Sequence, residues 1–101
     1  MQRYLCIHTF GPGTMTRQQV EQFSRSAQQA KEVHGLHSYV NLSEGKAACI
    51  FESDSKSTLD GFFKKMHMPV DSITAIEMEG EQGTWHDALQ PPTAGTSVSP
   101  M

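Results

Sequence analysis

The sequence predicts an α+β fold in which a four-stranded antiparallel sheet carries two helices on one face. The clearest observation is at residues 36–52, where two apolar runs flank the turn Glu44-Gly45-Lys46, the pattern of a β-hairpin. A second observation is an amphipathic helix pattern on each side of this hairpin, and a third is a strand pattern at each end of residues 1–80. The order strand–helix–strand–strand–helix–strand is that of the split βαβ, or ferredoxin-like, fold.

The first strand covers about residues 3–10 and ends before a Gly-Pro-Gly breaker. Thr16 is placed to cap the first helix, and Gln19 completes a capping box. The apolar residues of this helix recur at spacings of three and four: Val20, Phe23, Ala27 and Ala30. We expect the helix to run to His34, with Gly35 as its C-terminal stop.

The strands of the hairpin cover about residues 36–42 and 46–52. Ser55 is the expected cap of the second helix, whose apolar face is built at i, i+3, i+4 and i+7 from Leu59, Phe62, Phe63 and Met66. Pro69 prevents this helix from continuing. The last strand is expected at about residues 72–78.

Length and composition indicate one ferredoxin-like domain at residues 1–80 and a polar tail rich in Pro, Ser and Thr at residues 81–101. The net charge of -3 offers no clustered basic surface for nucleic acid or an anionic membrane. The chain has no apolar run long enough for a bilayer and no secretory signal pattern at its start. We therefore expect a cytoplasmic protein that binds neither nucleic acid nor membrane.

The two cysteines, Cys6 and Cys49, each lie inside a predicted strand. Two cysteines provide no disulfide framework, and their spacing is not that of a zinc or redox motif. We expect both to be small buried hydrophobic residues with free thiols.

Two helices can cover only one face of a four-stranded sheet, so the other face needs a partner. The residues predicted for that face are too apolar to leave in water: Leu5, Ile7, His37, Tyr39, Ile50, Ile73 and Ala75. The expected solution is a homodimer in which two sheets pack face to face as a dimeric α+β barrel.

Strand alternation places His37, Tyr39 and Glu52 together on the face away from the helices. A neutral imidazole and a carboxylate on a rigid sheet suit a borderline divalent ion such as nickel or zinc. His37 and Glu52 are therefore the predicted metal ligands, and Tyr39 is the predicted contact for a bound ligand. His8 is the expected additional metal ligand, but if Cys6 packs beneath the helices, His8 packs there too.

Between about residues 4 and 77, several short stretches follow one another in an order that resembles that of one protein family. They are Tyr4-Leu5-Cys6-Ile7-His8-Thr9-Phe10, His37-Ser38-Tyr39-Val40, Lys46, Cys49-Ile50-Phe51-Glu52, Ser55, Leu59, Met68-Pro69-Val70-Asp71 and Ile73-Thr74-Ala75-Ile76. Their order resembles the small ferredoxin-like domains of the domain of unknown function 4242 family, some of which are described as nickel-binding. The resemblance implies a homodimer and a bound nickel ion. Relatives commonly have acids at the positions of Ile7 and Ala75, where this chain is apolar.

The expected function is thus binding of nickel, another divalent transition metal or a small ligand on the sheet face. One alternative is a dimeric α+β barrel enzyme of the isomerase or cofactorless monooxygenase type, with His37 or Tyr39 as general acid or base. The other is a structural or interaction module without a ligand. Ser38 points to the face opposite His37, so the two adjacent residues form no catalytic dyad. The sequence favours a binding protein over an enzyme.

Overall fold

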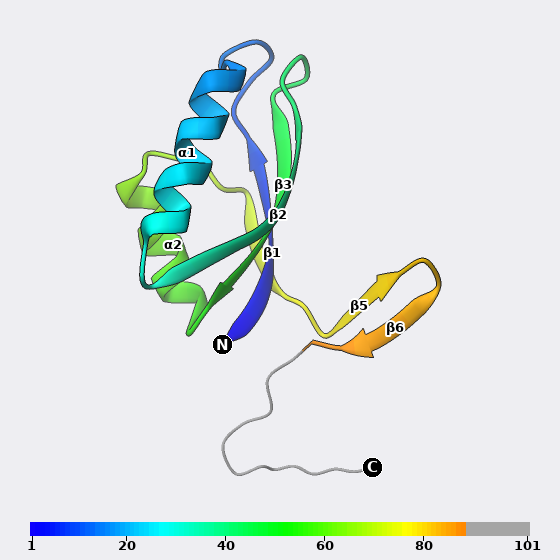
Figure 1. The fold of residues 1–101 in the computed structure, drawn as a ribbon. Helices are drawn as coiled ribbons and strands as arrows, with labels where there is room; N and C mark the ends of the chain where they lie inside the picture. Colours follow the sequence, from blue (N-terminus) through cyan, green and yellow to red (C-terminus); the bar gives the residue numbers. More distant parts are fainter. Residues whose placement is uncertain (89–101) are drawn as a thin grey trace.

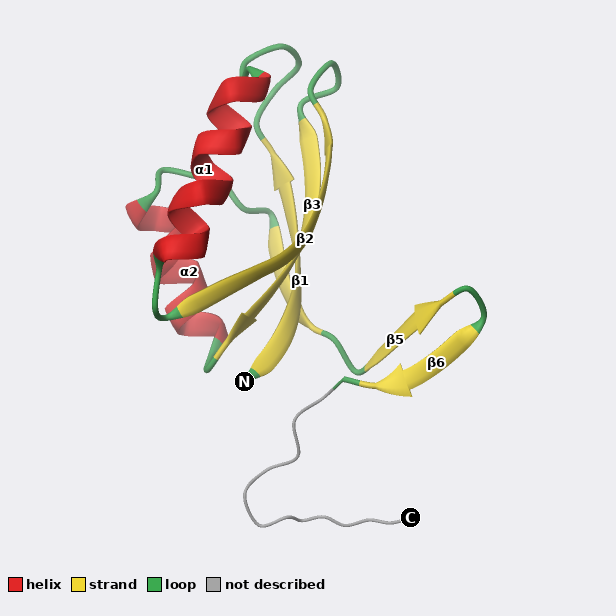
Figure 2. Ribbon diagram, in the orientation of Figure 1, coloured by secondary structure: helices red, strands yellow, loops and turns green. Residues whose placement is uncertain are grey.

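Residues 1–88 are described by the structure, which is a computed structural model. The elements in chain order are β1 (Gln2–Thr9), α1 (Arg17–Gln29), β2 (Val33–Asn41), β3 (Lys46–Ser53), α2 (Lys56–Lys65), β4 (Ser72–Ala75), β5 (Met78–Glu81) and β6 (Thr84–Asp87). Four strands form an antiparallel sheet in the order β2-β3-β1-β4, and both helices cover one face of it (Figures 1 and 2). The predicted βαββαβ fold is confirmed.

Both helices begin at the predicted caps. The backbone N–H of Gln19 donates to Thr16 Oγ1 over 3.1 Å, and the N–H of Thr16 donates to Gln19 Oε1 over 2.8 Å, so the capping box is complete. At α2, the N–H of Thr58 donates to Ser55 Oγ over 3.0 Å. Neither helix in residues 1–88 is long and apolar enough to cross a lipid bilayer.

The end of α1 differs from the prediction. The helix ends at Gln29, and its cap residue Ala30 already has extended backbone angles. Val33 then starts β2 with its side chain fully buried, so burial of this residue in the sheet ends the helix early. His34 and Gly35 belong to β2 and are not at a helix terminus, which corrects both assignments.

The core lies between the helices and the sheet and is centred on α2. Leu59, Phe62 and Phe63 are buried there, as the apolar spacing predicted. Phe63 packs edge-on against Phe51 of β3, with ring centroids 5.2 Å apart, and Phe23 of α1 completes the aromatic cluster. This cluster joins both helices to the centre of the sheet.

Cys6 of β1 and Cys49 of β3 lie directly opposite each other in the sheet. Both are buried and neither forms a disulfide, as predicted. Burial raises the pKa of the Cys6 thiol to about 12 and also raises the pKa of Cys49. The two residues therefore act as small neutral core side chains at ordinary pH.

The face of the sheet away from the helices, which we call the open face, has no covering element within residues 1–88 (Figure 1). Its exposed or half-buried apolar residues are Leu5, Ile7, Tyr39, Ala48 and Ile50. Two residues predicted for this face are not on it. Ile73 lies opposite Cys6, and Ala75 lies opposite Tyr4, both on the helix-covered face. The open-face positions of β4 are Ser72 and Thr74.

The chain continues beyond β4 into the hairpin of β5 and β6, which projects to the side of the sheet away from the helices (Figure 1). The Trp85 ring lies over Gly80, where an added Cβ would come within 2.5 Å of the indole. Residues 81–87, predicted as the start of the tail, thus include most of this hairpin. The remainder of the predicted tail, residues 89–101, lies outside the described residues.

Candidate functional site

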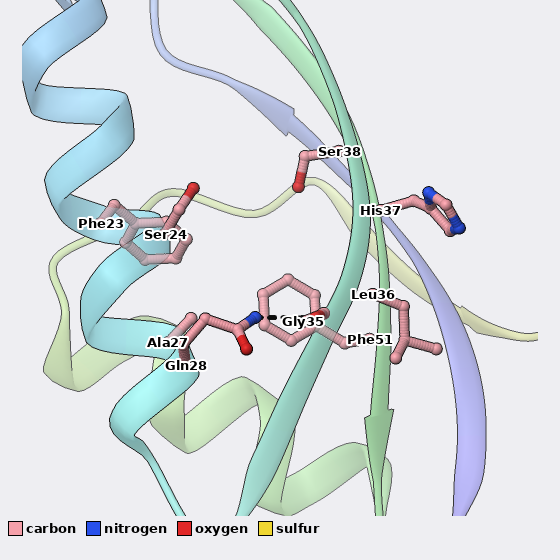
Figure 3. Close-up of a pocket in the computed structure, with 9 residues that line it drawn as sticks. All are labelled: Phe23, Ser24, Ala27, Gln28, Gly35, Leu36, His37, Ser38 and Phe51. Atoms are coloured by element: carbon pink, nitrogen blue, oxygen red, sulfur yellow. Dashed lines mark hydrogen bonds between the residues drawn. The ribbon is translucent and has the colours of Figure 1, made fainter.

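His37 and Tyr39 lie on the open face of β2, as strand alternation predicted. In the antiparallel pairing of β2 with β3, His37 is opposite Ile50 and Tyr39 is opposite Ala48. The His37 imidazole points away from α1, whereas Ser38 points toward the helix (Figure 3). Tyr39 is 69 % exposed. Both side chains are therefore accessible to a ligand or to a second protein molecule.

Glu52 also lies on the open face, where it belongs to a network of charged groups. The Nε of Arg3 donates to Glu52 Oε2 over 3.2 Å. The same guanidinium donates through Nη1 to both carboxylate oxygens of Glu79 in β5, over 2.8 and 2.9 Å. The hydrogen bonds to Glu79 and then to Glu52 raise the pKa of Arg3. Glu52 is thus held in place by a cation that also anchors the hairpin.

His34 is a further open-face residue that the sequence prediction missed. It lies opposite Glu52, and its Nδ1 is 3.7 Å from Glu52 Oε1. A β-bulge between Gly35 and His37 shifts the alternation, so His34 joins His37 and Tyr39 on one face. Gly35 was the sequence signal that could have indicated this bulge, because a glycine inside a strand often marks one.

His8 is separated from these residues by the sheet. Its side chain is 1 % exposed on the helix-covered face, edge-on to the Phe63 ring at 4.9 Å. The Nδ1–H donates to the carbonyl oxygen of Pro69 over 2.8 Å. Burial lowers the pKa of His8, while the bond to Pro69 and the charge of Asp71 oppose that shift. His8 therefore cannot act with His37 and Glu52 of the same chain, because it follows Cys6 to the opposite face.

A single chain does not provide a full set of conventional metal ligands. Among residues 1–88, no group of three or more His, Cys, Asp and Glu side chains is arranged to hold a metal ion. On the open face, His34 and Glu52 form a pair of neighbouring candidate ligands, and His37 lies further along β2. A metal site on this face would need ligands from a second chain or from solvent.

A cleft of about 190 Å³ lies between α1 and the edge strand β2 (Figure 3). It is lined by Phe23, Ser24, Ala27, Gln28, Gly35, Leu36, His37, Ser38 and Phe51. Gln28 spans it, donating from Nε2 to the carbonyl oxygen of Gly35 over 2.9 Å. The imidazole of His37 points away from the cleft, so the cleft and the open face are separate features.

The comparisons with known proteins identify the family. The family model described as nickel responsive protein SCO4226-like matches residues 4–76. The chain belongs to this family. The match begins within β1 and ends after β4, so it includes His8, His37, Glu52 and nearly all of the four-stranded sheet of the SCO4226-like domain. No curated protein and no solved structure matches the chain.

Proposed function

We propose that this SCO4226-like protein binds a divalent transition metal, nickel in the first place, on the open face of its sheet. The observation that carries the proposal is that His34, His37 and Glu52 share the one sheet face that no described element covers. Neutral imidazole nitrogen is a good ligand for nickel, and a nearby carboxylate adds negative charge. The description of the family as nickel responsive supports nickel over other divalent ions.

We further propose that two copies of the chain complete the site by packing their open faces together. Each chain contributes too few ligands by itself, and a twofold interface would bring the same histidines from both copies to one place. Leu5, Ile7 and Ile50 would supply the apolar contact, and Tyr39 would line the bound ligand. Arg3 holds one oxygen of Glu52, so His37 is the principal ligand in this proposal.

The dimer is tested by placing a charge on the open face. Leu5→Glu should convert the protein to a monomer at micromolar concentration, because an unpaired carboxylate would be buried in the interface. Val40→Glu is the matched control, since Val40 is similarly exposed but faces the helix side of the sheet (36 % for Leu5, 39 % for Val40). Light scattering measures the mass of each protein. A monomeric wild type, or a dimeric Leu5→Glu variant, would contradict the proposed interface.

Nickel binding is tested by calorimetric titration of the wild type and of His37→Ala. We expect the variant to lose at least tenfold in affinity, because an imidazole ligand is removed from an exposed site. Nickel at about one hundred times its Kd should also raise the free energy of unfolding of the wild type by about 2.7 kcal/mol. His67→Asn is the control, since His67 is an exposed residue outside the sheet and Asn tolerates its φ of 57°.

The nickel proposal is wrong if His37→Ala binds nickel as tightly as the wild type, or if neither protein binds it. A loss of affinity in His67→Asn equal to that in His37→Ala would also count against it, because the binding would then depend on surface histidines in general.

A further inference from the structure

A small cavity lies on the helix-covered face of the sheet, separate from the open face. Its volume is about 30 Å³. A cavity of this size has room for a water molecule or a single ion. The residues that line it include His8 together with three sulfur-containing residues, Met15, Cys49 and Met68.

The hydrogen bonding of His8 leaves a ligand nitrogen free. A backbone carbonyl can only accept, so the bond from Nδ1 to Pro69 O places the proton on Nδ1. The Nε2 of the neutral ring then carries a lone pair. This atom is buried and has no hydrogen-bond partner within residues 1–88. A histidine that donates one ring N–H to a backbone carbonyl and keeps the other nitrogen free is the usual arrangement of a metal ligand.

The two methionines come from separate loops that both line the cavity beside His8. Met15 lies in the loop before α1, and Met68 directly precedes Pro69, the residue that orients the imidazole. Met68 is itself held by a hydrogen bond from its N–H to the carbonyl oxygen of Phe63 over 2.9 Å. The chain segment that fixes the tautomer of His8 thus also brings Met68 to the wall of the cavity.

We infer that this cavity is a binding site for a soft monovalent metal ion, Cu⁺, held by His8 Nε2 and the sulfur atoms of Met15 and Met68. Thioether sulfur is a neutral, soft donor that selects Cu⁺ over hard or borderline divalent ions, and neutral imidazole also binds copper. Neutral donors also suit a monovalent ion in an apolar core, because the site then carries only one net charge. Cys49 also lines the cavity and completes its sulfur-containing wall. This chemistry differs from the imidazole and carboxylate of the open face.

The test is a competition for Cu⁺ between the metal-free protein and the chromophoric chelator bicinchoninate under anaerobic conditions. We expect the wild type to take up one Cu⁺ per chain. The double variant Met15→Leu/Met68→Leu should lose at least tenfold in Cu⁺ affinity, because both thioethers are removed at nearly constant volume. Met66→Leu is the control, since Met66 packs against the core but does not line the cavity.

The thermal stability of each metal-free variant shows whether it remains folded. The inference is overturned if the wild type takes no Cu⁺ from the chelator, which would leave water as the occupant of the cavity. It is also overturned if the double variant binds Cu⁺ like the wild type. His37→Ala should retain Cu⁺ binding, so failure of the nickel proposal and failure of this one can be distinguished.

Discussion

Replacing Phe63 by Ala is expected to lower the free energy of unfolding by about 3–5 kcal/mol, the range for loss of a fully buried phenylalanine. Phe63 has no exposed surface and contacts His8, Phe51 and Phe62 through its ring. Its removal would leave a cavity at the point where α2 meets β1 and β3, because neighbours held by strand pairing cannot move in to fill it. Urea unfolding followed by circular dichroism measures the change.

Two further variants show whether the effect comes from burial. Phe63→Leu should cost less than Phe63→Ala, because most of the apolar contact remains. Trp85→Ala removes a larger aromatic ring that is 62 % exposed on the hairpin, and should change the free energy of unfolding by less than about 1 kcal/mol. A cost below about 1 kcal/mol for Phe63→Ala would mean that α2 does not pack as described.

Gly45→Ala is expected to destabilise the fold by about 2–5 kcal/mol. Gly45 has a φ of 73°, a left-handed conformation that costs an L-residue about 1–2 kcal/mol. An added Cβ would also overlap the backbone of Gly11 and come within 2.6 Å of Pro12 N. Overpacking of this kind adds about 1–3 kcal/mol. The contact is tight because the carbonyl oxygen of Gly45 accepts hydrogen bonds from the N–H groups of Phe10, at 2.8 Å, and Gly11, at 3.3 Å.

Gly83→Ala separates the two contributions. Gly83 has a similar φ of 86°, but an added Cβ there meets nothing within 4 Å. We expect it to cost only the backbone strain, about 1–2 kcal/mol. The difference between the two variants, measured by urea unfolding, is therefore the cost of the clash between the loops. Equal costs would show that the loop at Gly11 moves aside easily.

The elements with strong local signals were determined by the sequence. The apolar spacing of α2, together with Ser55 and Pro69, predicted the helix and its buried face, because helix periodicity and capping depend on residues within a few positions of one another. The turn at Gly45 determined the register of the hairpin in the same way. It predicted that His37 shares a face with Ile50 and Glu52, and the structure places His37 opposite Ile50 on the open face.

The faces of more distant residues were decided only by the tertiary structure. The position of His34 depends on a β-bulge in β2, and that bulge lies where Gly35 packs against the Phe51 ring. The faces of Ile73 and Ala75 depend on how β4 pairs with β1, which is reached through a crossover from α2. A shift of one residue in either place moves every side chain to the other face.

The residues of the candidate metal sites were likewise determined in part by the sequence and in part only by the tertiary structure. The sequence determined that His37, Tyr39 and Glu52 share a face, since three residues of one hairpin have a register set by its turn. It left open the face of His8, which the structure resolves by burying Cys6 and His8 together beneath the helices. The cavity at His8 brings in Met15 and Met68 from two separate loops, and only packing of the whole chain can place them there. Local patterns therefore specify the elements and the hairpin, whereas contacts between distant segments decide which side chains share a site.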